Sequence, residues 1–363
     1  MTDIRFEEES ASPGRRANLD LWLNLTLVFV VLVMLGGAAW FGYSVYRDKQ
    51  ADFATSAAGR LVGLLEGQVR QNPNDVILRV RLGEALGGMG KYEDATEQLN
   101  AALKIEPKHI GAHLDLGLVA MASKDRPAAE SYFKKVIELT GGGQFSALDS
   151  SREIALFNLG NIALEKKDYG AAAGYYKGAL VIRKDASDTY YRLAQALDGM
   201  GEIDGAIREL EIGIQFDPGF AEAHFLLGQL YKKNKDDVNA SYQFAKAVEL
   251  APDADPPREA LEAFGPSTKW VEQARAQLAA GSMEEAVTSV LIARNLDAKS
   301  LEAAKLHAEI LVKRQSLKDA LDVYRQAAAI DPKNAEVKAQ IAALEPQVAE
   351  ILKQEARKKK SKK

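Results

Sequence analysis

The sequence predicts an all-helical protein: an α-solenoid of about seven antiparallel helix pairs, preceded by a single transmembrane helix near the N-terminus. Two observations lead to this prediction. Small residues recur every 34 residues with two longer gaps, and residues 21–46 form an apolar run without a charged side chain. A period near 34 is typical of stacked two-helix repeats, and an uncharged run of this length is long enough to span a bilayer.

A glycine or alanine at a fixed position marks each helix pair. Taking the first residue of each pair as position 1, this marker is position 8, and the spacings are 34, 43, 34, 34, 46 and 34 residues. The markers are Gly83, Gly117, Gly160, Ala194, Gly228, Ala274 and Ala308. The two long spacings predict loops inserted before the third and the sixth pair.

Other positions keep the same register. Position 20 is always alanine: Ala95, Ala129, Ala172, Ala206, Ala240, Ala286 and Ala320. Position 24 is large and apolar: Leu99, Phe133, Tyr176, Leu210, Phe244, Val290 and Tyr324. Two helices pack closely only where small side chains face each other, so we expect the alanines in buried seams and the large residues between neighbouring pairs.

Small residues at positions 8, 20 and 27, a large one at 24 and a proline at 32 together resemble the tetratricopeptide repeat family. The prolines are Pro107, Pro218, Pro252 and Pro332, and the weak turn at Gly141–Gly143 departs from the pattern. The resemblance implies repeats near residues 76–109, 110–143, 153–186, 187–220, 221–254, 267–300 and 301–334 within a solenoid over 76–334.

The composition fits a folded chain, with 47% hydrophobic and 27% charged residues and a formal net charge of −4. The absence of cysteine excludes disulfides, zinc–thiolate sites and thiol catalysis. The last seven residues, 357–363, are nearly all basic. This tail is either a solvated end or a contact for anionic lipid, whereas nucleic acid is disfavoured because the rest of the chain is acidic.

The apolar run at residues 21–46 predicts a retained membrane anchor behind a polar tail at residues 1–20. As a helix it would extend roughly 39 Å, enough to cross a ~30 Å hydrocarbon layer. Trp22 at one end and Trp40 and Tyr43 near the other match interfacial aromatic belts. A cleaved signal peptide has a shorter apolar core, and a buried helix does not fit the repeat period.

The orientation of the chain across the membrane is less constrained by the sequence, because the numbers of basic residues on the two sides of the apolar run are nearly equal. Arg15 and Arg16 beside a short leader favour a cytoplasmic N-terminus, which places the repeats outside the cytoplasm. The alanine-rich, cysteine-free composition suggests a bacterial chain. We therefore expect a single-pass protein of the bacterial inner (cytoplasmic) membrane.

The segments that flank the repeats also have apolar faces. Residues 47–75 predict a linking helix that corresponds to a degenerate half repeat. Its apolar face is Leu61, Leu64, Leu65 and Val69. The helix either continues from the anchor or follows a hinge near residues 52–59. Residues 335–356 predict a capping helix that Pro346 kinks. The insertion at residues 255–267 permits a short helix over 258–264 and a joint between five repeats and two.

The sequence contains no convincing catalytic constellation, and it predicts no cofactor and no metal site. His109 and His113 have metal-compatible spacing, but they straddle a turn between repeats, and no carboxylate or thiol completes a set. We therefore expect a non-enzymatic protein.

The resemblance implies that positions 5 and 9 of the first helices line a concave groove. The candidate groove residues are Val80, Leu114, Phe157, Asn161, Tyr191, Gln195, Phe225 and Gln229. In three successive repeats an aromatic residue is followed four residues later by a carboxamide, so the two side chains share a helix face. Aromatics suit the apolar side chains of an extended peptide and carboxamides suit its backbone; the alternative is that position 5 only packs between helices.

Some family members clamp a partner's C-terminal carboxylate, but Phe157 and Asp188 stand here where lysines would be needed.

Taken together, these features predict a membrane-anchored scaffold that binds a partner protein or extended peptide and aids assembly or secretion at the cell envelope. The alternatives are a regulatory or structural subunit of a membrane enzyme complex, for example in cytochrome maturation, and a purely structural spacer.

Overall fold

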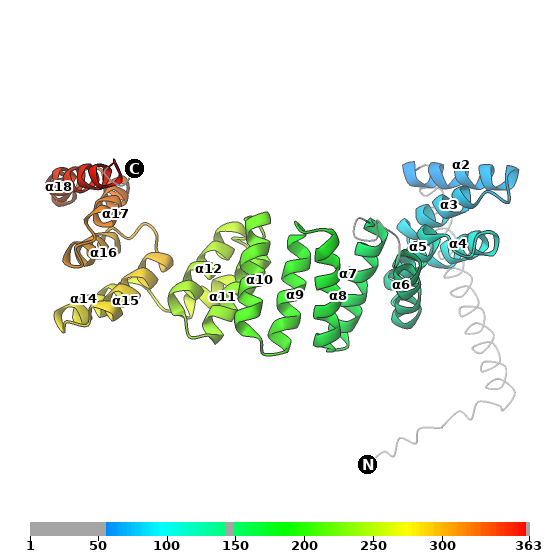
Figure 1. The fold of residues 1–363 in the computed structure, drawn as a ribbon, viewed down its shortest axis with the longest axis horizontal. Coiled ribbons are helices and arrows are strands. Elements are labelled where there is room, and N and C mark those ends of the chain that lie inside the picture. The colour runs from blue at the N-terminus through cyan, green and yellow to red at the C-terminus, as the bar shows by residue number, and fades with distance from the viewer. Residues whose placement is uncertain (1–55, 142–148, 361–363) are drawn as a thin grey trace, which may run out of the picture. The chain divides into compact units, whose positions relative to one another are not determined.

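The computed structural model describes residues 56–141 and 149–360, and every regular element within them is an α-helix (Figure 1). The predicted all-helical class is confirmed for these residues. The predicted polar tail and transmembrane helix lie outside the described residues, as do residues 47–55, 142–148 and 361–363. None of the described helices is long and apolar enough to cross a membrane.

The chain forms two compact units, Met1–Ala129 and Glu130–Lys363. The helices of the first unit are α2 (Ala57–Gln71), α3 (Val76–Gly88), α4 (Tyr92–Ile105) and α5 (Ile110–Ala122). The boundary between the units falls within α6 (Arg126–Thr140).

The second unit contains a longer series of helices. They are α7 (Ser150–Glu165), α8 (Tyr169–Ile182), α9 (Ser187–Gly199), α10 (Ile203–Phe216), α11 (Ala221–Lys233), α12 (Asp237–Leu250), α13 (Asp255–Glu262), α14 (Ser267–Ala279), α15 (Met283–Leu296), α16 (Leu301–Lys313), α17 (Leu317–Ile330) and α18 (Ala335–Lys360). Figure 1 shows α7 to α12 stacked side by side in chain order. Each hairpin packs on the next through its second helix, as α8 does on α9 and α10 on α11.

The recurrent alanines lie in the seams between helices, as predicted. Ala172, Ala206 and Ala240 each have 0% exposed surface. One turn further along the same helices, the position-24 side chains of Tyr176 and Leu210 are also buried. These contacts form the core of the α7–α11 stack.

The glycines at position 8 allow the closest approach within a helix pair. A Cβ atom added to Gly160 would lie 2.5 Å from Cε1 of Tyr176, and one added to Gly228 would lie 2.6 Å from Cδ1 of Phe244. Because the facing ring belongs to the second helix of the same pair, the missing Cβ lets the two helices pack closely.

The turn within each pair has the same backbone geometry in all seven pairs. Position 15 has a positive φ, at Gly90, Lys124, Lys167, Gly201, Lys235, Gly281 and Gln315. This left-handed residue ends the first helix, as is common at helix C-termini. Four of the seven are not glycine, so the αL conformation is retained there despite its steric cost.

The turn between pairs is fixed by a side-chain hydrogen bond that the sequence analysis did not predict. In five pairs the position-4 side chain bonds the backbone carbonyl six residues earlier; these side chains are Arg79, His113, Tyr190, His224 and Trp270. For Trp270 the indole Nε1 donates to the Phe264 carbonyl over 2.8 Å. Each bond satisfies a turn carbonyl that the helix ladder leaves open.

The linking helix begins within the range of the hinge alternative, and its buried face agrees only in part with the predicted one. Ser56 has extended backbone geometry and its hydroxyl accepts from the Gly59 N–H, so α2 begins at Ala57 and does not continue through Ser56. The buried face is Val62, Leu65 and Val69, whereas Leu61 and Leu64 are 50% and 59% exposed. The predicted face was therefore rotated, although α2 does pack on α3.

The C-terminal helix and the second insertion also extend beyond their predicted bounds. The helix α18 runs to Lys360 with Pro346 inside it, so the described start of the basic tail is helical. Val337, Leu344 and Val348 are buried, as a capping helix requires, whereas Leu352 is 51% exposed. The insertion forms α13, which begins three residues earlier than predicted, because Pro256 and Pro257 occupy its first turn.

We expect Gly160→Ala to destabilise the third pair by more than about 1 kcal/mol, because the added Cβ must displace the buried Tyr176 ring. The matched control is Gly174→Ala on α8, where an added Cβ meets no atom within 4 Å. That change should stabilise the helix by about 0.5–1 kcal/mol. Urea unfolding followed by circular dichroism measures both, and equal effects of the two changes would contradict the packing argument.

Candidate functional site

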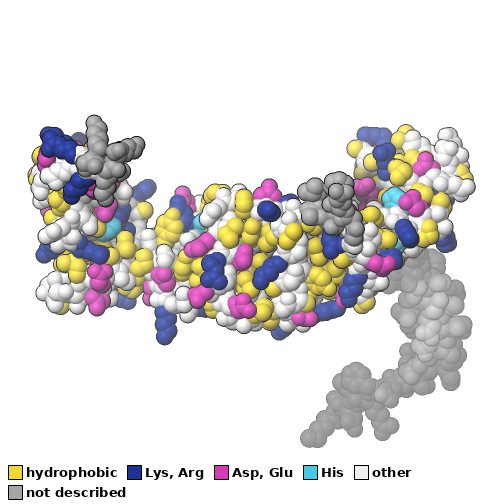
Figure 2. Space-filling view, viewed as in Figure 1, with side chains coloured by type: hydrophobic (Ala, Val, Ile, Leu, Met, Phe, Trp, Pro, Cys, Tyr) yellow, Lys and Arg dark blue, Asp and Glu magenta, His cyan; other side chains and the backbone are white. Residues whose placement is uncertain are grey.

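Six of the predicted groove residues lie on the first helices of three successive pairs. Phe157 and Asn161 are on α7, Tyr191 and Gln195 on α9, and Phe225 and Gln229 on α11. We call the helix faces that carry these six residues the central face. Figure 2 shows hydrophobic, basic and acidic side chains intermixed over the α7–α12 stack.

On α7 the aromatic and carboxamide side chains both contact Tyr176. The Phe157 ring meets the Tyr176 ring edge-on, with centroids 5.9 Å apart. The Tyr176 hydroxyl donates to Oδ1 of Asn161 over 2.8 Å. Phe157 is therefore partly used in packing, while the Nδ2 amide of Asn161 can still donate to a ligand.

On α9 the predicted pair is joined by an arginine. The Gln195 Nε2 donates to the Tyr191 hydroxyl oxygen over 3.1 Å, and Arg192 Nη1 donates to Gln195 Oε1 over 3.0 Å. The guanidinium lies 5.8 Å from the centre of the Tyr191 ring. Burial raises the pKa of the Tyr191 hydroxyl, so its proton stays in place and can be donated to a bound segment.

On α11 the face opens into a cavity of about 540 Å³ lined by Gln229, Lys232, Lys233 and Phe244. Gln229 is exposed, and Phe225 packs on the buried Phe244 ring at 5.8 Å. Lys233 forms an ion pair with Asp198 of α9, and Lys232 forms one with Asp237 of α12. These ion pairs fix the two lysine side chains that line the cavity together with Gln229.

The other two predicted residues lie in the first unit. Val80 on α3 is half-buried, and Leu114 on α5 is only 9% exposed, so it presents little surface. A cavity of about 280 Å³ lies between these two helices, and its lining includes Glu84, Asp115 and Leu118. Burial, together with the nearby charge of Glu84, raises the pKa of Asp115 to about 6.

Sequence reasoning did not find Lys232 and Lys233 and did not connect Arg192 with the Tyr191–Gln195 pair. Arg192 follows Tyr191 directly, so helical periodicity places it off the predicted face, and only its length lets it reach Gln195. Lys232 and Lys233 end α11 as basic last-turn residues do in many helices, and that position offers no signal of a cavity.

The carboxylate clamp of some family members is not assembled here. Asn158 donates to the Ile154 carbonyl of its own helix, and Asp188 pairs with Arg183.

The two closely spaced histidines are structural. His109 caps α5 by accepting from the Ala112 N–H, and His113 bonds the Pro107 carbonyl. Within the described ranges, no group of three or more histidine, aspartate or glutamate side chains is placed to hold a metal ion.

The raised pKa of Asp115 gives a pH-dependent prediction. Because its folded pKa lies above the unfolded value, the stability that protonated Asp115 contributes is complete below about pH 4 and is lost as pH rises through about 6. Asp115→Asn should therefore raise the free energy of unfolding at pH 7.5, on the order of 1 kcal/mol after allowing for solvent screening, and change little at pH 4. Thermal melts at both pH values measure this.

Glu97→Gln, on the exposed side of α4, is the control and should show no such pH-dependent gain. A gain from Asp115→Asn that is the same at both pH values would show that Asp115 ionisation is not its cause.

Three models of protein families match the chain, and each is described as a tetratricopeptide repeat. One matches residues 163–230, one matches residues 80–143 and 271–335, and one matches residues 221–254. Together these matches span more than half of the 363 residues.

Two curated relatives match shorter stretches of this chain than the family models do together. The chain is 33% identical over 64 residues to the protein O-mannosyl-transferase Tmtc2 of Drosophila melanogaster, across 17% of this chain and 7% of that protein. It is 20% identical over 190 residues to the tetratricopeptide repeat and J domain-containing co-chaperone DNJ1 of Fusarium oxysporum f. sp. lycopersici, across 52% of this chain and 36% of that protein. The chain thus spans only 7% of one relative's length and 36% of the other's.

Among solved structures, the fold is similar to that of YrrB, a TPR protein with an unusual peptide-binding site. The TM-score is 0.46 and the identity 19%, over 54% of this chain and 96% of that one. The repeat register, the helix pairs and the family matches agree, and the chain therefore contains tetratricopeptide repeats over residues 80–143, 163–254 and 271–335.

Proposed function

We propose that this protein is a membrane-anchored, non-enzymatic scaffold that binds an extended segment of a partner protein along the central face. The observation that carries the proposal is the repetition of a half-buried aromatic ring beside a polar side chain in three successive pairs. Stacked repeats present such positions in a row, which suits a ligand that is itself linear.

The polar groups of the central face favour donation over acceptance. Internal hydrogen bonds occupy the side-chain oxygens of Asn161 and Gln195. The Asn161 amide, the Tyr191 hydroxyl and the Gln229 amide can still donate. An extended peptide exposes a carbonyl oxygen at each residue, so this set of donors fits its backbone, while the rings contact its apolar side chains.

The membrane part of the proposal rests on the sequence of residues 21–46. Anchored there, the repeats would act beside the bilayer, with the solenoid outside the cytoplasm of a bacterial cell. A scaffold in that place would aid assembly or secretion at the envelope, and the basic tail would contact anionic lipid headgroups.

Photocrosslinking from the central face tests the binding role. With p-benzoylphenylalanine at Gln229 in the full-length chain, we expect capture of a defined partner in the native cells and much less capture from Lys177, an exposed residue on α8. Tyr191→Ala combined with Phe225→Ala should reduce capture at least about tenfold, because buried aromatic anchors dominate such interfaces.

The control for the alanine pair is Tyr242→Ala, an aromatic residue on α12 that is 45% exposed. It should leave capture unchanged, and circular dichroism should show that each variant keeps its helices. Undiminished capture by the Tyr191/Phe225 variant would refute the central face as the binding surface.

Single introduced cysteines test the anchor and its orientation, since the natural chain has none. We expect Asn74→Cys, in the exposed turn before α3, to react with a membrane-impermeant maleimide once the outer barrier is opened. Thr2→Cys should react only after the inner membrane is lysed. The reverse pattern would overturn the orientation, and release of the chain from membranes by alkaline carbonate would overturn the anchor.

A further inference from the structure

The stacking rule of the second unit changes at the insertion between α12 and α14. In the preceding pairs, a second helix packs on the first helix of the next pair. At the insertion, α12 packs on α13 and on α15, which is the second helix of the following pair. Asn295 of α15 fixes this contact by donating to the Val238 carbonyl and to the Ser241 hydroxyl of α12, each over 3.0 Å.

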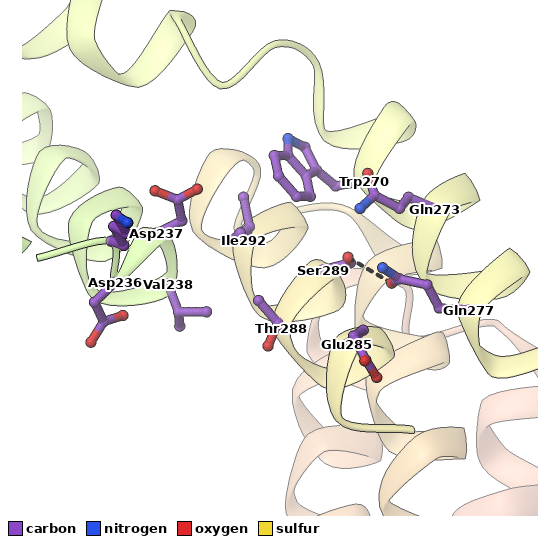
Figure 3. Close-up of a pocket in the computed structure, with 11 residues that line it drawn as sticks. Asp236, Asp237, Val238, Trp270, Gln273, Gln277, Glu285, Thr288, Ser289 and Ile292 are labelled. Carbon is purple, nitrogen blue, oxygen red and sulfur yellow. Dashed lines mark hydrogen bonds between the residues drawn. The ribbon is translucent and has the colours of Figure 1, made fainter. Parts of the chain in front are cut away.

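A cavity of about 530 Å³ opens where the stacking changes, and we call it the joint cavity. Figure 3 shows Trp270, Gln273 and Gln277 of α14 on one side and Asp236, Asp237 and Val238 at the start of α12 on the other. Glu285, Thr288, Ser289 and Ile292 of α15 complete the lining together with Lys235.

The side of α14 that lines the cavity is polar at two positions that are mostly apolar in the preceding pairs. Position 7 is a buried leucine in the first five pairs, namely Leu82, Leu116, Leu159, Leu193 and Leu227, each no more than 3% exposed. In the sixth pair it is Gln273, which is exposed. Position 11 is buried and apolar at Leu86, Ala120, Ala163 and Leu197 but is Gln277 here.

Polar residues at these positions would also be expected if α14 simply faced solvent at the end of a stack. Here, however, they line a cavity whose side chains are held by hydrogen bonds. Gln277 Oε1 accepts from the Ser289 hydroxyl over 2.8 Å, which fixes the carboxamide across the floor (Figure 3). The Trp270 indole N–H is bonded to the Phe264 carbonyl, which fixes the ring. The Lys269 ammonium lies 5.8 Å from the ring centre, so a cation can reach this indole.

The charges of the lining identify the kind of ligand. Three carboxylates, those of Asp236, Asp237 and Glu285, line the cavity with one basic side chain, Lys235. Asp237 is neutralised by Lys232, and Asp236 caps α12 by accepting from the Asn239 N–H. Glu285 has no ion pair with any described residue, so its carboxylate is available to a cation from outside.

We propose that the joint cavity binds an arginine side chain on a segment of a partner protein. A guanidinium is planar, stacks on an indole face and donates up to five hydrogen bonds in a fixed fork. The Glu285 carboxylate, the Gln273 carbonyl oxygen and the Thr288 hydroxyl line the same cavity as Trp270 and supply acceptors along it. Lysine would gain the charge contact but neither the stacking nor the fork, so arginine is preferred.

Trp270 provides a direct readout, since the other two tryptophans are Trp22 and Trp40. The full-length chain with Trp22→Phe and Trp40→Phe, in detergent, is titrated with acetyl-Gly-Arg-Gly-amide while tryptophan emission is followed. We expect a saturable change with this peptide, at least about fivefold weaker binding of the lysine analogue, and no saturable change with the glutamate analogue.

Two variants separate binding from structure. Glu285→Gln and Gln273→Leu should each weaken arginine binding at least about fivefold, although the second introduces the leucine found at this position in the first five pairs and should not unfold the hairpin. The matched control, Glu272→Gln, removes the same charge from an α14 residue outside the lining and should bind as the parent does.

A titration with no saturable change, or equal binding by Glu285→Gln, Gln273→Leu and Glu272→Gln, would overturn the proposal. The outcome does not depend on the central face, because none of its six residues lines the joint cavity.

Discussion

The close contact between a small residue at position 8 and a large one at position 24 governs the geometry of this protein. Where position 8 is glycine, as at Gly160 and Gly228, a ring of the second helix occupies the space of the missing Cβ. This contact sets the distance between the two helices, and the alanines at position 20 set the seams. A ladder of side chains on successive first helices exists only because these spacings repeat.

At the joint between α12 and α14, position 7 of the first helix is not the leucine found in the first five pairs, and the packing there differs accordingly. With glutamine at position 7, α14 has no leucine to bury against the preceding pair, and α13 and α15 cover α12 instead. The change opens a cavity whose walls are held by the Ser289–Gln277 and Trp270–Phe264 hydrogen bonds. One repeat design thus provides both a regular aromatic face and, at the interruption, a polar cavity.

The sequence predicts the helical class and the buried seams well, because spacing and side-chain size determine both. It could not predict the turn bonds at position 4, because Arg79, His113, Tyr190, His224 and Trp270 share only a hydrogen-bond donor and no common size or polarity. It misplaced the face of α2, where Leu61 and Leu64 are exposed, since a single terminal helix offers too few turns to define its orientation. For the central face it identified neighbours along one helix, whereas the bonds of Tyr176 to Asn161 and of Lys233 to Asp198 join different helices.

The most direct test of the position-8 contact gives the third pair the residues that the fourth pair has at positions 8 and 24. The double variant Gly160→Ala/Tyr176→Leu reproduces the Ala194/Leu210 combination, and amide hydrogen exchange of α7 and α8 reports the local stability. If the contact sets the helix spacing, the double variant will regain most of the protection that Gly160→Ala alone loses. Protection that falls by the sum of the two single losses would contradict this origin of the fold.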